Sequence, residues 1–108
     1  MIKTLKNSAK EGGTYTIQVI LKDEDKNLVI PNEITYTLSD KDGNIINSIE
    51  NINITPASIL NITLFGDSLT TGWKILTLKG TYDSNYGINL PLRDSVKFYV
   101  DDLIKENV

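Results

Sequence analysis

Glu-Ile-Thr-Tyr-Thr-Leu-Ser, residues 33–39, is the clearest indication of secondary structure in the sequence. Ile34, Tyr36 and Leu38 alternate there with polar or charged residues. Successive side chains of a β-strand point to opposite faces of a sheet, so this period of two predicts a strand with one buried face. Isoleucine, threonine and tyrosine also fit a pleated surface well. The stretch therefore predicts a long β-strand.

The same alternation recurs along the chain and indicates the fold class. Apolar residues occupy every second position in residues 15–21, 60–64, 76–82 and 96–100. Turn-forming residues separate such segments at intervals of roughly 8 to 12 residues, and no segment has the period of an α-helix. Uneven loops favour Greek-key connections over an up-and-down meander. The sequence predicts an all-β fold, an immunoglobulin-like (Ig-like) antiparallel β-sandwich of about seven strands.

Three regions of the chain differ in pattern. Residues 1–13 are polar and contain Gly12-Gly13, which indicates an N-terminal arm or a first edge strand. Residues 14–103 carry the strand pattern of the sandwich, and residues 104–108 form a polar C-terminal tail. Within the sandwich, residues 23–27 are typical of an exposed hairpin tip, and residues 66–72 predict a loop that places Leu69 beneath the sandwich.

Charge and hydropathy narrow the expected partners. The 108 residues have a formal net charge of −3, and the lysines are scattered, so no basic stripe is present to neutralise phosphates. The first residues lack the apolar region of a signal peptide, and no window approaches the roughly 18 apolar residues of a membrane-spanning helix. We therefore expect neither nucleic acid nor a membrane as a partner.

Missing residue types argue against catalysis. The chain contains no histidine and no cysteine, which removes imidazole bases, thiolate nucleophiles and most transition-metal sites. An enzyme would instead need a pocket with perturbed carboxylates, which the sequence does not indicate. We expect a non-enzymatic protein without a cofactor.

Two acidic stretches, residues 23–25 and 40–44, contain candidate calcium ligands. Asp40 and Asp42 could supply the oxygen ligands that a hard cation prefers. The spacing is incomplete for an EF-hand loop, which ends in a bidentate glutamate and lies between helices. Aspartate and glycine are also the ordinary residues of hairpin turns, so we favour a plain turn at both stretches, with Gly43 supplying a positive φ.

The aromatic side chains are a second candidate surface. Exposed rings could form a platform that stacks against sugars, because an aromatic face is apolar. Several of these residues lie at inward-facing or cross-strand positions, where aromatic side chains pack. We expect packing roles for all of them except Tyr86; the set is Tyr15, Tyr36, Trp73, Tyr82, Tyr86 and Tyr99.

Residues 82–92 combine turn chemistry with apolar side chains. Residues 83–87 are dense in turn formers, which predicts an exposed loop. Exposed apolar clusters often mark protein interfaces. The alternative is a loop that folds back to cap the end of the sandwich. The candidate partner-binding residues in this segment are Tyr86, Ile88, Leu90 and Leu92.

Several segments together resemble a known family. They are Pro31 to Asp40 leading into Asp42-Gly43, Thr55-Pro56 with the strand that follows to Gly66, Leu76 to Ser84, and Asn89 to Leu92 leading into Val96-Lys97-Phe98. In this order and spacing, the stretch from Ile30 to Leu103 resembles small Ig-like proteins encoded among the virion genes of tailed bacteriophages. The resemblance implies an Ig-like fold and no catalytic residues.

The resemblance also implies a function. It indicates a structural protein of a phage virion, an accessory or decoration component of the head, neck or tail that is assembled in the host cytoplasm. Its expected partners are other virion proteins, with homo-oligomers as an option, and residues 1–13 and 82–92 are the expected contacts. The alternative is a carbohydrate- or host-surface-binding Ig-like module, which would need aromatic side chains exposed together with polar groups.

Overall fold

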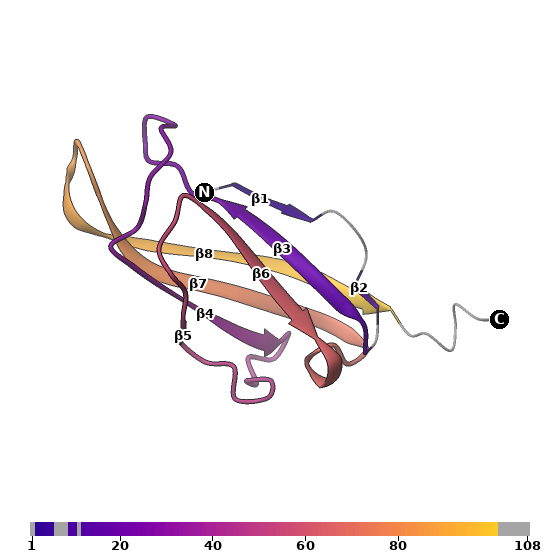
Figure 1. Ribbon diagram of the computed structural model, residues 1–108. Coiled ribbons are helices and arrows are strands. Elements are labelled where there is room, and N and C mark those ends of the chain that lie inside the picture. The colour runs from indigo at the N-terminus through magenta and orange to yellow at the C-terminus, as the bar shows by residue number, and fades with distance from the viewer. Residues whose placement is uncertain (1, 6–8, 11, 102–108) are drawn as a thin grey trace.

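The computed structural model describes residues 2–5, 9–10 and 12–101, with side chains for residues 12–101. These residues form eight strands and one three-residue 3-10 helix, arranged as two sheets (Figure 1). The prediction of an all-β fold is confirmed. The expected C-terminal tail, residues 104–108, lies outside the described residues.

One sheet has three strands in the order β1-β3-β6, all antiparallel. The strands are β1 (Ile2–Leu5), β3 (Thr14–Ile20) and β6 (Ile59–Phe65). Side chains of β3 and β6 alternate between buried and more exposed positions along both strands, as the sequence pattern predicts.

The other sheet has five strands in the order β2-β8-β7-β4-β5. These are β2 (Ala9–Lys10), β4 (Glu33–Asp40), β5 (Ile52–Asn53), β7 (Gly72–Ser84) and β8 (Gly87–Asp101). Neighbours are antiparallel except β2 and β8, which run parallel. Residues 33–39, with the clearest alternation in the sequence, belong to β4, which lies between β5 and β7.

The hydrophobic core lies between the two sheets, which Figure 1 shows as two layers. Tyr15 of β3 and Phe98 of β8 meet across it, with ring centroids 5.1 Å apart. Tyr36 and Tyr82, at apolar positions of the alternating segments, are only partly buried and pack against the core. The other apolar side chains of these segments are buried, as predicted: Tyr15, Ile17, Val19, Leu21, Ile34, Leu38, Leu60, Ile62, Leu64, Leu76, Leu78, Val96, Phe98 and Val100.

Two connections between strands also match the prediction. The 3-10 helix η1 (Gly66–Ser68) leads into Leu69, which is 1% exposed and belongs to the core. Residues 23–27 form the predicted tip, of which residues 24–27 are exposed. Asp23 Oδ1 accepts hydrogen bonds there from the backbone N–H groups of Asp25 and Asn27, both at 2.9 Å.

The described residues form eight strands, against the expected number of about seven, and two of the eight are very short. β2 and β5 contain two residues each, too few for alternation to be visible in the sequence. β1 and β2 also divide the N-terminal residues between the two sheets, since β1 pairs with β3 and β2 pairs with β8.

Candidate functional site

The segment expected to be a loop, residues 82–92, is the outer part of a β-hairpin. β7 continues to Ser84 and β8 begins at Gly87, so only Asn85 and Tyr86 lie between the strands. Cross-strand pairing continues outward to Tyr82 and Leu90, and a bulge follows before Ser84 pairs with Gly87. The expectation of a loop is wrong. The polar residues of this segment are typical of turns, but here they form hydrogen bonds with each other and with a neighbouring segment.

The structure separates the four candidate residues of this segment. Tyr86 is 67% exposed and Ile88 is 77% exposed, whereas Leu90 is half-buried. Leu92 is only 1% exposed and belongs to the core. Its assignment as a partner-binding residue is therefore a mistake: Leu92 lies on the inner face of β8, at the same alternate positions as Val96.

Two further exposed apolar residues lie at the same end of the molecule, and sequence analysis missed them. Leu28 is 57% exposed and Ile30 is 64% exposed. They belong to the β3–β4 connection, which is joined to β7 by a 2.7 Å hydrogen bond from the Asn32 N–H to the Thr81 carbonyl. We call residues 23–32 and 82–89 together the distal end. The sequence feature that indicates the distal end is the apolar run 28–30, which lies outside any alternating segment.

A group of polar side chains fixes the shape of the distal end. Asp83 Oδ1 accepts a hydrogen bond from Asn32 Nδ2 at 2.9 Å and another from the Asn89 backbone N–H at 2.8 Å. Asn32 Nδ2 also donates to Asn89 Oδ1 at 3.1 Å. The hydrogen bonds from Asn32 and Asn89 hold the pKa of Asp83 below its ordinary value, so this carboxylate is ionised at neutral pH.

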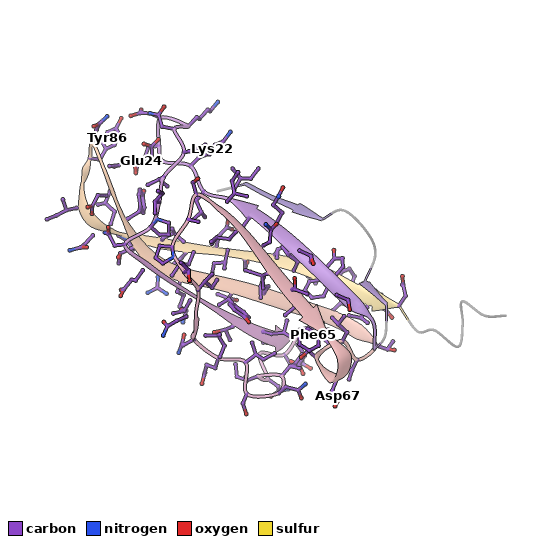
Figure 2. All side chains as sticks on the ribbon, viewed as in Figure 1. Lys22, Glu24, Phe65, Asp67 and Tyr86 are labelled. Carbon is purple, nitrogen blue, oxygen red and sulfur yellow. The ribbon has the colours of Figure 1, made fainter. Side chains whose placement is uncertain are left out.

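The exposed tip 23–27 is joined to the hairpin by a second set of hydrogen bonds. Glu24 accepts from the Tyr82 hydroxyl and from Ser84 Oγ, and the Tyr86 hydroxyl lies 3.5 Å from Asp25 Oδ1. The Tyr82 hydrogen bond lowers the pKa of Glu24 and raises the pKa of Tyr82. Figure 2 shows Glu24 and Tyr86 at the same end of the molecule, opposite to Phe65 and Asp67.

Asp40 and Asp42, the candidate calcium ligands, lie at a turn at the other end of β4. Asp40 Oδ1 accepts hydrogen bonds from the backbone N–H groups of Asp42 and Asn44, both at 2.9 Å, and Oδ2 accepts from Asn44 Nδ2 at 3.1 Å. Gly43 has the positive φ of 87° that the turn interpretation predicts. These bonds, chiefly those from Asn44, lower the pKa of Asp40. Nowhere in the described residues do three or more potential metal ligands gather.

Near the Asp40 turn, a hollow of about 570 Å³ is lined by both aromatic and charged side chains. Trp73 and Tyr99 are 44% and 42% exposed and meet edge to face, with centroids 5.2 Å apart. Lys97 Nζ lies 4.7 Å from the centroid of the Trp73 ring. The two rings pack across neighbouring strands, as expected, and they also remain open to solvent. The lining comprises Asp40, Lys41, Asp42, Ile46, Thr70, Thr71, Gly72, Trp73, Lys74 and Tyr99.

Lys74, in the wall of this hollow, is an unusual residue. It is a lysine at an inward-facing position of β7, only 3% exposed, and it pairs with Asp40 across the β4–β7 ladder. Burial lowers the pKa of Lys74, and the negative charge of Asp40 acts in the opposite direction. Lys74 and Asp40 lie opposite each other at the end of the β4–β7 ladder, and nothing in the alternation of apolar residues signals a buried lysine.

Comparisons of the chain with protein-family models, with curated proteins and with solved structures found no match. The helical content of the described residues is one short 3-10 turn, and none of it is long and apolar enough to span a membrane.

Proposed function

We propose that the chain is a non-enzymatic, Ig-like structural protein of a phage virion that binds other virion proteins through its distal end. The observation that carries the proposal is the exposure of four large apolar side chains, Leu28, Ile30, Tyr86 and Ile88, at one end of the molecule. Large exposed apolar groups on a soluble domain favour a protein contact. The resemblance of residues 30–103 to phage virion proteins supplies the class of partner.

The strand order supports the Ig-like part of the proposal. In the notation of Ig domains, β1, β3 and β6 correspond to strands A, B and E, and β8, β7, β4 and β5 correspond to G, F, C and C′. β2 then corresponds to a second part of strand A that pairs in parallel with G. Chain crossings between the sheets after β3 and after β5 agree with Greek-key connections.

The hydrogen bonds around Asp83 and Glu24 support the role of the distal end. They join the tip 23–27 and the segment around Asn32 to the β7–β8 hairpin before any partner binds. A surface that is already ordered loses less conformational entropy on binding than a mobile loop does. The distal end is therefore suited to repeated, identical contacts with a protein partner.

Mass spectrometry of purified virions from the phage that encodes this chain tests the proposal. We expect the chain at many copies per particle, measured against the major capsid protein. Its absence from clean particles would overturn the proposal.

A carbohydrate-binding module is the second candidate, favoured by the hollow beside Trp73. Trp73 and Tyr99 are exposed there beside the exposed Lys41 and Thr70 and the half-buried Asp40. This is the combination of aromatic and polar groups that sugar binding requires. Trp73 is the single tryptophan of the chain, so its fluorescence reports on this hollow alone. A sugar from a glycan array that shifts this fluorescence, and loses binding in Trp73→Ala, would favour the second candidate over the first.

A further inference from the structure

β6 has a free edge in the described part of the chain. It is the last strand in the order β1-β3-β6, so one of its two edges pairs with β3 and the other has no strand beside it. The side chains of Ile59 and Phe65, on the outer face of this strand, are 46% and 65% exposed.

The hydrogen bonds at the two ends of the β3–β6 ladder show which backbone groups face the free edge. Gly66 donates to the Gly13 carbonyl at 3.0 Å, and Leu21 donates to the Ser58 carbonyl at 2.8 Å. Bonded pairs recur at every second residue of an antiparallel ladder, so Leu60, Ile62 and Leu64 bond to β3. The N–H and C=O groups of the alternate residues, Ile59, Asn61, Thr63 and Phe65, therefore point outward.

This edge lacks the devices that usually keep edge strands from pairing. Charged side chains, proline, bulges or very short length normally protect such edges. β6 is seven residues long, contains no charged residue and no proline, and pairs with β3 in continuous register. The free edge of β6 can therefore accept another strand.

We infer that β6 pairs antiparallel with β6 of a second copy of this chain, joining two three-stranded sheets into one of six strands. With the two-fold axis at Ile62, Ile59 lies opposite Phe65 of the second copy, and Asn61 lies opposite Thr63. Each of these four residues directs its backbone groups outward, so this register satisfies all of them. It also places a β-branched side chain beside an aromatic ring at both ends, a favourable cross-strand pair.

The charges around β6 favour a second copy over other occupants. Asp67 is the one charged residue between residues 57 and 67, and in this register it lies opposite Ala57 of the second copy, so no like charges meet. Pairing of β6 with β1 of another copy would be heterologous and would continue into an open polymer. The symmetric β6 pair closes after two copies.

Sedimentation equilibrium of the full chain and of three variants tests the inference. Thr63→Lys introduces a charge beside the two-fold axis, and Asn61→Pro removes an outward N–H without removing a backbone bond to β3, although it loses the side-chain hydrogen bond from Gln18. Thr77→Lys, on the outer face of the central strand β7, is the matched control. We expect concentration-dependent dimers for the wild type and Thr77→Lys, and a dissociation constant at least about tenfold higher for Thr63→Lys and Asn61→Pro. Circular dichroism melting checks that each variant folds.

Cysteine cross-linking tests the register, because the chain has no cysteine of its own. Opposed residues in a bonded pair have Cα atoms about 5.5 Å apart, within the range of a disulfide. Oxidising an equal mixture of Asn61→Cys and Thr63→Cys chains should give mixed dimers well beyond the roughly twofold excess over either homodimer that random pairing produces. A monomer at every concentration, an open polymer, or a dimer that survives Thr63→Lys and is lost in Ile88→Ser would overturn the inference.

Discussion

Gly80 has no side chain at a point where β7 passes close to the backbone of β4. A Cβ atom built on Gly80 would lie 2.1 Å from the carbonyl oxygen of Glu33 and 3.0 Å from the Cα of Ile34, and both of these are backbone atoms. We expect Gly80→Ala to lower the free energy of unfolding by about 1–3 kcal/mol, because the strands must move apart. Urea denaturation measures the change.

The exposed Lys79→Ala variant is the control for Gly80→Ala, and it should stay within about 0.5 kcal/mol of the wild type. Equal stability of Gly80→Ala and the wild type would show that the close approach of the two strands is not required.

Asp83 makes stability depend on pH at the distal end. Its pKa in the folded state is lower than the ordinary 3.8, so its hydrogen bonds stabilise the fold fully above that ordinary value. This contribution is lost as the pH falls through the lowered pKa. Asp83→Asn removes the titrating group, and we expect it to lose less stability than the wild type between about pH 7 and about pH 3. Urea denaturation at both pH values provides the comparison, and an equal loss in both proteins would contradict the assignment.

At the scale of elements, the β7–β8 hairpin is the part of the fold that sequence analysis described least well. Alternation of apolar residues identified β3, β4, β6 and the inner parts of β7 and β8, because each of these has one face on the core. Beyond Tyr82 the hairpin projects past the core, and a bulge interrupts its register. The pattern of a half-buried strand is lost there, so turn-forming residues dominated the prediction.

Leu92 and Ile88 lie on the same strand and should respond differently to truncation. Leu92 is 1% exposed and Ile88 is 77% exposed. We expect Leu92→Ala to lower the free energy of unfolding by about 2–5 kcal/mol, because it leaves a cavity in the core. Ile88→Ala should change it by about 0.5 kcal/mol or less. Thermal or urea denaturation checks both, and similar losses would mean that the hairpin tip packs against other residues.

At the scale of the whole molecule, the candidate sites depend on which segments meet, and that information is not local. Tyr86 and Ile88 could be identified from the sequence, since apolar residues follow a dense turn signal. Leu28 and Ile30 could not be joined to them, because hydrogen bonds across about fifty residues, such as that from Asn32 to Asp83, bring the segments together. The hollow beside Trp73 likewise combines residues from three separate parts of the chain.

Competition between wild-type and variant chains for incorporation into phage particles tests whether the distal end binds other virion proteins. During phage growth, host cells would produce the wild-type chain and a Tyr86→Ser/Ile88→Ser double variant in equal amounts. Mass spectrometry of the purified particles then measures how much of each chain has been incorporated. Ile45→Ser, at an exposed apolar residue outside the distal end, is the control. We predict that wild-type chain outnumbers the double variant at least about tenfold and that Ile45→Ser is incorporated as well as the wild type. Equal incorporation of the double variant, or absence of all chains from clean particles, would contradict binding through the distal end.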